Sequence, residues 1–187
     1  MQRCGWVSSD PLYLAYHDQE WGVPLHSTQS LFEMICLEGQ VAGLSWFTVL
    51  KKRENYRQHF HHFDVRAVAN MGEEDIERLM QERGIIRHRG KISAIIANAQ
   101  AVLAMETAGE SFHDFIWSFV DNQPKITYFH HYTEIPTTNS TSDAMSKALK
   151  KRGFKFVGST TCYSFMQACG LINDHTTDCF CHPNNRV

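Results

Sequence analysis

The sequence predicts an all-α protein built as a single domain. Apolar residues recur every three or four positions through most of residues 28–150, which is the period of a helix with one buried face. Strand signals are weak throughout, and no internal repeat or low-complexity segment interrupts the pattern. At 187 residues the chain is long enough to bury a real core and short enough to form one domain.

The stretch 31–46 is the most informative part of the chain, and we place the working site there. Its apolar residues have helical spacing, yet the carboxylate of Glu38 stands among them. A buried carboxylate must pair, shift its pKa or face a cavity, because an isolated buried charge is very costly. The alternative is that Glu38 lies on the exposed face of its helix. Gly39 and Gly43 indicate a bend or the close approach of another backbone, with the flat ring of Trp46 near the same opening.

Composition describes a soluble globular chain, with 43% hydrophobic and 20% charged residues. No apolar run approaches the roughly 18 residues of a membrane-spanning helix, and the N-terminus lacks a signal-peptide pattern. We therefore expect a cytoplasmic protein with no membrane partner. In that reducing compartment six cysteines indicate metal binding or burial rather than disulfides.

The net charge of −2 does not indicate a nucleic-acid partner, but the distribution of charge is more informative. Three short windows, 51–57, 87–91 and 147–155, hold most of the lysines and arginines. A solvated helix face explains any one window. Three of them, two flanked by glycine, fit contacts with phosphate better.

Aromatic residues are concentrated in residues 1–24, which carry Trp6, Tyr13, Tyr16 and Trp21 between turn signals. They form either a peripheral patch of core or an aromatic wall that stacks on a flat ring such as a flipped base. A cationic ring would gain about 0.5–2 kcal/mol more from cation–π attraction.

Helix signals continue along the chain. Ser30 is a candidate N-cap for the first long helix, with Glu33 completing a capping box. Further helices are expected at 73–80, 91–106 and 112–120, and 84–90 is a short turn between two of them. A surface loop at 121–140 then leads to Ser142, a candidate cap of the next helix.

Residues 143–170 have the form of a helix-hairpin-helix: a helix at 143–152, a glycine-bounded turn at 153–158 and a helix at 159–169. The backbone N–H groups at the start of the second helix would suit a DNA phosphate. A purely structural hairpin also needs glycine. The lysines and arginine around this turn favour DNA.

Cysteine and histidine lie near both ends of the chain. Cys4 and His17 are close to the start, and His175 and Cys179 form an H-x3-C pair near the end. Such a Cys2His2 set is a closed, structural zinc site, because four protein ligands leave no position for water. Spacing alone also allows Cys181 or His182 as ligands, and allows Cys4 and His17 to be unconnected residues.

Four motifs together resemble one known family. They are RCGW at 3–6, YHDQEWGVP at 16–24, LFEMICLEGQVAGLSW at 31–46 and GFKFVG at 153–158. The chain resembles the bacterial 3-methyladenine DNA glycosylase I family of the helix-hairpin-helix glycosylase superfamily, from residue 3 to about residue 179.

The resemblance implies a monomeric base-excision repair enzyme that hydrolyses the N-glycosidic bond of 3-methyladenine in alkylated double-stranded DNA, at the bacterial nucleoid. It implies a helical core at 28–170 and a lobe made of 1–27 and 171–187, in which one structural zinc joins the termini. The implied zinc ligands are Cys4, His17, His175 and Cys179.

The resemblance also implies which residues act. The implied base pocket is made of Trp6, Tyr13, Tyr16, Glu38 and Trp46. Its aromatic rings stack on the base, while Glu38, the catalytic candidate, and the Tyr16 hydroxyl contact the base edge. Methylation at N3 makes the base a cation and a good leaving group, so little acid catalysis is needed. The implied DNA contacts are Gly43, Leu44, Lys155, Gly158, Ser159 and Thr160. Leu44 is a candidate wedge for the vacated space in the duplex, although a core position is the default for leucine.

One departure from the superfamily concerns its catalytic aspartate, which many members place after the second helix of the hairpin. Asp174 lies in that region but adjoins His175, so we assign it to the zinc lobe. Some members also use a lysine nucleophile, and no lysine follows Lys155. This favours a monofunctional enzyme without strand cleavage.

Two other functions compete with base excision. A non-catalytic, zinc-stabilised helix-hairpin-helix DNA-binding module explains the hairpin, the cations and the cysteines, but not a carboxylate among aromatic rings. A zinc hydrolase would need one of the four ligands to be absent, and it leaves the hairpin unexplained.

Overall fold

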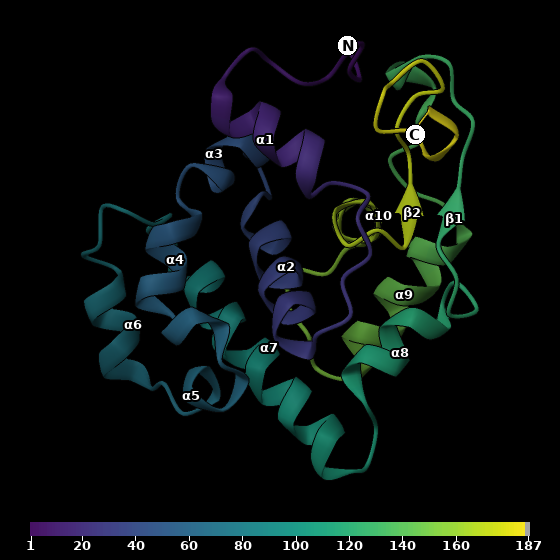
Figure 1. Ribbon diagram of the computed structural model, residues 1–187. Coiled ribbons are helices and arrows are strands. Elements are labelled where there is room, and N and C mark those ends of the chain that lie inside the picture. Colours follow the sequence, from purple (N-terminus) through teal and green to yellow (C-terminus); the bar gives the residue numbers. More distant parts are fainter. Residues whose placement is uncertain (186–187) are drawn as a thin grey trace.

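The computed structural model describes residues 1–185, and they are mostly helical (Figure 1). The helices are α1 (Pro11–Gln19), α2 (Thr28–Gln40), α3 (Trp46–Leu50), α4 (Arg53–His59), α5 (Val65–Ala69), α6 (Glu73–Leu79), α7 (Arg89–Thr107), α8 (Phe112–Ser118), α9 (Ser140–Lys151) and α10 (Ser159–Ala168). Single 3₁₀ turns occur at η1 (His61–Phe63), η2 (Tyr132–Glu134) and η3 (Pro183–Asn185). The predicted all-α class is therefore confirmed at the level of a mostly helical fold.

The one departure is a short ladder. Strands β1 (Lys125–Ile126) and β2 (Ile172–Asn173) pair in parallel, with Lys125 opposite Ile172. This pairing ties the expected surface loop at 121–140 to the segment that follows α10. Two residues per strand carry too little periodicity to be recognised in the sequence.

Helix α2 runs through the centre of the molecule, and α7 and α10 pack against it (Figure 1). Residues 34–40 of this helix are all buried, so it is covered on every side rather than along one stripe. Glu38 therefore has no exposed face available to it. The alternative of a solvated helix glutamate is wrong because neighbouring elements surround the whole last turn.

Gly39 marks the close approach of another backbone, as the sequence predicts. A Cβ at this position would lie 3.2 Å from the Cβ of Phe156 and 3.3 Å from its carbonyl oxygen. The turn between α9 and α10 therefore rests directly on the last turn of α2. Gly43 has φ +76°, a value that favours glycine, and it turns the chain from α2 towards α3.

Both predicted helix caps are wrong by one turn. The N-cap of α2 is Ser27, whose hydroxyl accepts a hydrogen bond from the Ser30 amide at 3.0 Å. The N-cap of α9 is Asn139, which accepts from the Ser142 amide at 2.8 Å. In each case two polar residues stand three apart, so either could cap, and the earlier one adds a turn of helix. Glu33 pairs with an arginine of α4 rather than with a cap.

The two ends of the chain lie side by side at one end of the molecule (Figure 1). The Phe180 amide donates to the Gln2 carbonyl at 2.9 Å, and the Gly22 amide donates to the Gln167 carbonyl at 3.0 Å. A second apolar cluster, separate from the main core, forms there. Its buried members are Cys4, Tyr16, Trp21, Leu50, Cys179 and Cys181. Residues 186 and 187 of the expected terminal lobe lie outside the described residues.

Within residues 1–185 no single helix combines the length and apolar character needed to cross a bilayer. Helices α7 and α8 meet that test only as a pair, and a bend of 96° separates them.

Candidate functional site

A cavity of about 330 Å³ opens between α1, α2, α3 and α10. It is lined by Trp6, Tyr13, Tyr16, Trp21, Glu38, Val41, Trp46, Ser164 and Gln167. The structure thus brings together all five residues expected to form the base pocket, although they come from four separate segments of the chain. Five of these nine residues are aromatic, which suits a flat ring.

The aromatic side chains brace one another. The ring of Trp6 meets Trp21 edge-on at a centroid distance of 4.9 Å and lies tilted against Tyr13 at 5.2 Å. Tyr13 stacks on Phe47 at 4.9 Å. Edge-to-face and stacked pairs at these distances are the favourable arrangements, so the wall is held in place before a ligand arrives.

Two indole nitrogens in this wall, those of Trp6 and Trp46, are buried and have no hydrogen-bond partner among residues 1–185. A buried N–H without a partner costs free energy. A ligand acceptor atom that bonded to either nitrogen would relieve that cost.

Glu38 lies in the last turn of α2 and is only 5% exposed. Its carboxyl group faces the cavity without a hydrogen bond or an ion pair to any other described residue. Burial alone raises the pKa of Glu38 to about 8. Proximity to Glu38 also adds to the effect of burial in raising the pKa of Tyr16 and of Tyr13. No lysine or arginine is among the described residues that line the cavity, so Glu38 has no positive charge beside it. A cationic ligand would supply that charge.

A second cavity of about 370 Å³ adjoins the first and shares Glu38, Val41 and Ser164 with it. The remaining residues that line it are Ala42, Gly43, Leu44, Thr160 and Thr161. Three of the expected DNA contacts therefore surround one opening. Leu44 is 44% exposed, so the default of a core leucine is wrong at this position.

The hairpin presents an open helix N-terminus. Gly158 is the N-cap of α10, and a Cβ there would meet nothing within 4 Å. The first amide of α10 that bonds within the helix is that of Cys162, so the preceding amides are unsatisfied. The Ser159 hydroxyl already donates to the Asp143 carboxylate at 2.6 Å, which leaves only its backbone N–H for a ligand. Lys155 is exposed in the same turn.

Fewer side chains of the three cationic windows are free to contact phosphate than the sequence indicates. Four of their arginines are neutralised by carboxylates: Arg53, Arg57, Arg89 and Arg152. Lys91 is buried and donates to the carbonyls of Gln40 and Ala42 at the end of α2. Within the described part of these windows, the cations other than Lys91 that lack a carboxylate partner are Lys51, Lys52, Arg87, Lys147, Lys150, Lys151 and Lys155.

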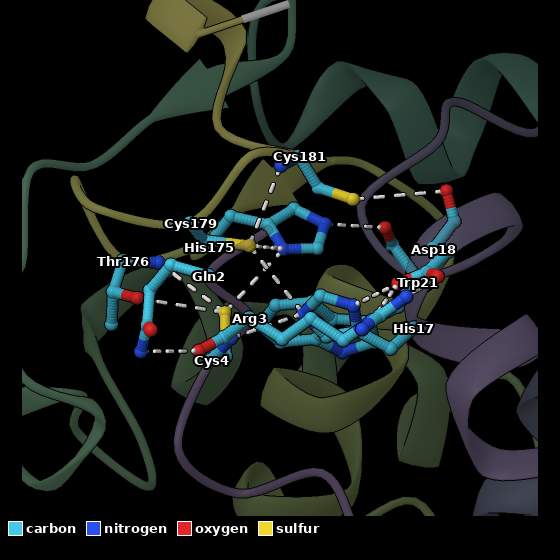
Figure 2. A network of polar contacts seen from close by, with 10 residues as sticks. All are labelled: Gln2, Arg3, Cys4, His17, Asp18, Trp21, His175, Thr176, Cys179 and Cys181. Atoms are coloured by element: carbon cyan, nitrogen blue, oxygen red, sulfur yellow. Dashed lines mark hydrogen bonds and ion pairs between the residues drawn. The ribbon is translucent and has the colours of Figure 1, made fainter.

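Cys4, His17, His175 and Cys179 converge at the junction of the chain ends, and all four are buried (Figure 2). The sulfur of Cys179 lies 3.6 Å from Nε2 of His17 and 3.5 Å from Nδ1 of His175. Bonds of about 2.3 Å to sulfur and 2.1 Å to nitrogen in a tetrahedron place the two ligand atoms roughly 3.6 Å apart. The four residues could therefore hold a tetrahedral metal ion.

Outer contacts fix both histidine rings for this task. Nδ1 of His17 lies 2.8 Å from the Asp18 carboxylate, which leaves Nε2 as the unprotonated nitrogen facing the cluster. Nε2 of His175 donates to the Trp21 carbonyl at 2.9 Å and leaves Nδ1 unprotonated. A carboxylate or carbonyl behind each ligand histidine is the usual second layer of a zinc site.

The two sulfurs also suit a cation. The backbone N–H of Thr176 donates to the Cys4 sulfur at 3.4 Å. A hydrogen bond from Cys4 lowers the pKa of Cys179, and the same contact raises the pKa of Cys4. A bound metal ion would favour loss of the proton from both thiols. Cys181 instead directs its sulfur to the Asp18 carbonyl at 3.7 Å.

Sequence reasoning did not assign four of the residues that line the first cavity: Trp21, Val41, Ser164 and Gln167. Trp21 belongs to the N-terminal aromatic group but was not assigned to the pocket. The two polar residues continue a stripe on α10 that starts at Thr160, at positions i, i+4 and i+7. A polar stripe on a helix that packs against α2 is the signal that would have found them.

An aromatic cavity with a partnerless buried carboxylate fits a flat, positively charged ring, and the helical fold places this cavity beside an open hairpin. The fold and the site thus define a helical protein that binds such a ring. The chain belongs to the methyladenine glycosylase family, whose model matches residues 6–182.

Named relatives agree along the whole chain. DNA-3-methyladenine glycosylase 1 of Escherichia coli (strain K12) is 69% identical over 186 residues, which cover 100% of both chains. The DNA-3-methyladenine glycosylase of Haemophilus influenzae is 56% identical, covering 96% of this chain and 97% of its own. A crystal structure of a 3-methyladenine DNA glycosylase I in complex with 3-methyladenine, carrying a tyrosine-to-phenylalanine substitution, superposes with a TM-score of 0.94. It is 43% identical and covers 98% of both chains.

The raised pKa of Glu38 predicts a pH-dependent loss of stability. Between pH 4.5 and pH 8 the unfolded chain releases the Glu38 proton while the folded protein retains it, so stability falls as the pH rises through this range. Glu38→Gln removes the titration. Its Tm should equal that of the unaltered protein near pH 4.5 and exceed it by at least about 4 °C at pH 8.5. Thermal unfolding of both proteins across this range checks the result, and a Tm difference independent of pH would contradict it.

Proposed function

We propose that this protein removes 3-methyladenine from alkylated double-stranded DNA by hydrolysing its N-glycosidic bond, the first step of base excision repair. The observation that carries the proposal is Glu38, a buried carboxylate without a partner in the wall of an aromatic cavity. Its relatives from Escherichia coli and Haemophilus influenzae, which match nearly the whole chain, are named for the same activity.

The cavity accounts for recognition of a damaged base. Adenine methylated at N3 in DNA is a cation, whereas the normal base is neutral. Burial raises the pKa of Glu38, and a cation beside it stabilises the ionised carboxylate. The site therefore distinguishes the damaged base from the normal one by its charge. Trp46 and Trp6 stack on the ring, Tyr13 completes the wall, and the Tyr16 hydroxyl contacts the base edge together with Glu38.

Hydrolysis then needs little acid catalysis. When the bond between the base and C1′ of the sugar breaks, its electron pair leaves with the base and neutralises the charge. Water forms the new bond to C1′ and releases one proton to solvent, which leaves a hydroxyl group on the sugar. With the base in the first cavity, the deoxyribose lies in the second one, on the other side of Glu38. Neither cavity is lined by lysine, which supports release by water and a monofunctional enzyme without strand cleavage.

The hairpin of α9 and α10 is the proposed phosphate clamp of a helix-hairpin-helix. The amides of Gly158, Ser159 and Thr160 donate no backbone hydrogen bond among the described residues, and Lys155 adds a positive charge. Exposed Leu44, carried on the turn that starts at Gly43, fills the space that the flipped nucleotide leaves in the duplex.

One structural zinc is proposed for the cluster of Cys4, His17, His175 and Cys179. The chain is then a single glycosylase domain with two parts, a helical core at 28–170 and a zinc lobe formed by 1–27 and 171–187, in which the ion joins the chain ends. Four protein ligands leave no open position, so the ion supports the fold and takes no part in hydrolysis.

We further propose that the protein acts as a monomer in the bacterial cytoplasm, at the nucleoid.

Incubation with methylated duplex DNA, followed by chromatography of the released bases, tests the activity. The protein should release 3-methyladenine and leave the strand uncut.

Glu38→Ala should weaken binding of the free base by at least tenfold. Removing one partner of a buried charged contact costs about 2–5 kcal/mol, and a tenfold loss of affinity needs only about 1.4 kcal/mol. Glu38→Gln should lose less, and affinity for undamaged duplex should not change. A protein that bound duplex but released no base would be the non-catalytic module instead.

Zinc content tests the metal assignment. The purified protein should hold about one zinc per chain, and Cys179→Ser should lower zinc content and Tm together. Cys181→Ser is the matched control, because Cys181 is equally buried two residues away but directs its sulfur elsewhere. Full zinc occupancy in Cys179→Ser, with loss in Cys181→Ser, would move the ligand to Cys181.

Gly158→Pro tests the hairpin. Gly158 has φ −63°, the angle that proline imposes, so the change removes one N–H without straining the turn. Duplex affinity should fall about tenfold, as expected for loss of a hydrogen bond to a charged group, while free-base binding is retained. Gly72→Ala alters the open N-cap of α6 and is the control, with no expected effect. Loss of free-base binding in Gly158→Pro would make the hairpin part of the pocket rather than a clamp.

A further inference from the structure

A second buried carboxylate, Asp174, lies behind the first cavity. It follows strand β2 and is fully buried, yet no cation pairs with it in the described residues. Three donors satisfy it instead. The Thr127 hydroxyl donates to Oδ1 at 2.7 Å, and the Tyr163 hydroxyl and Nε2 of Gln167 both donate to Oδ2 at 2.7 Å. Asp174 thus belongs to a network directed at α10 rather than to the metal cluster alone.

This network fixes the orientation of the Gln167 amide. A carboxylate only accepts hydrogen bonds, so the amide NH₂ of Gln167 must face Asp174. The remaining amide atom, Oε1, has no hydrogen bond to any described residue. Oε1 is also accessible. Among residues 1–185, the buried side-chain nitrogen and oxygen atoms that lack a hydrogen-bond partner are the indole nitrogens of Trp6 and Trp46, so a partnerless Oε1 must be exposed to some extent. Gln167 lines the first cavity, and its Oε1 is an acceptor that cannot reverse its polarity.

Fixed polarity separates Gln167 from the other polar groups of the cavity. The Tyr16 hydroxyl rotates and can donate or accept. Burial raises the pKa of Glu38 to about 8, so beside an uncharged base it can present either a protonated or an ionised carboxyl group. Neither group alone distinguishes a donor from an acceptor on the edge of an uncharged base. An oxygen held by Asp174 does, because a ligand acceptor placed against it would leave two acceptors facing each other.

We propose that Gln167 is a specificity-determining residue that accepts a hydrogen bond from the exocyclic 6-amino group of the bound base, and that Asp174 is its positioning residue. This inference rests on the proposed function. Adenine carries an amino donor at position 6, where guanine and hypoxanthine carry an oxygen acceptor. The cavity consequently selects 6-aminopurines and rejects 6-oxopurines.

Gln167→Met is the direct test, because methionine has a similar length and neither donates nor accepts as an amide does. Free 3-methyladenine and free 3-methylhypoxanthine, which differ at position 6 and in one imidazole N–H, are titrated against the fluorescence of the cavity tryptophans. The unaltered protein should prefer 3-methyladenine. In Gln167→Met its affinity should fall about tenfold, and that for 3-methylhypoxanthine should not fall, so the preference is lost.

Two variants separate positioning from general support of the fold. Tyr163→Phe removes another donor from the same Asp174 oxygen without lining the cavity, so the ratio of the two affinities should be unchanged. Asp174→Ala should lower the ratio towards that of Gln167→Met, and Asp174→Asn, which keeps an acceptor facing Gln167, should restore it. Zinc content and Tm are recorded for each, and Gln167→Met decides the question if Asp174→Ala does not fold.

The outcomes are distinct. An unaltered protein that binds no 3-methyladenine would refute the proposed function. A protein that binds 3-methyladenine with the same preference in Gln167→Met would overturn this inference and leave the function intact. An equal loss of preference in Tyr163→Phe would also overturn it, because the network would then be only structural.

Discussion

Burial of Glu38 without a partner is the constraint on which the rest of the site depends. The last turn of α2 is covered on all sides, and Gly39 lets the hairpin turn approach so closely that a Cβ there would lie 3.2 Å from Phe156. The carboxyl group can therefore face only the two cavities. Because desolvation disfavours its charge, the empty site is prepared to gain free energy from a cation, and neutral rings offer no such gain.

The aromatic wall and the cysteine–histidine cluster are one mechanical unit. Helix α1 carries Tyr16 on the cavity side and His17 on the cluster side. The ring of Trp21 meets His175 edge-on at 4.7 Å while also lining the cavity. Joining the chain ends through the cluster therefore holds the wall against α2. This arrangement explains why residues separated by more than 150 positions must meet before the cavity is complete.

Local patterns carried much of the prediction. Helical periodicity identified most of the helices, and the glycine in α2 correctly indicated a close backbone. The caps at Ser30 and Ser142 were wrong by one turn, because side-chain chemistry alone does not choose between two polar residues three apart. The cationic windows were also overestimated. Carboxylates that neutralise their arginines, such as Glu20 for Arg53, lie far away in sequence and belong to other elements.

The sequence by itself determined the helical class, because that depends on short-range spacing. Its resemblance to a glycosylase family pointed to the aromatic and carboxylate residues of the cavity and to the four residues of the cluster, where spacing alone left Cys181 and His182 as alternatives. Only the tertiary structure decided that Leu44 is exposed, that Ser164 and Gln167 reach the cavity, and that Asp174 orients Gln167. These facts arise where α10 packs against α2 and β2. Packing between distant elements sets direction and burial, which no local period encodes.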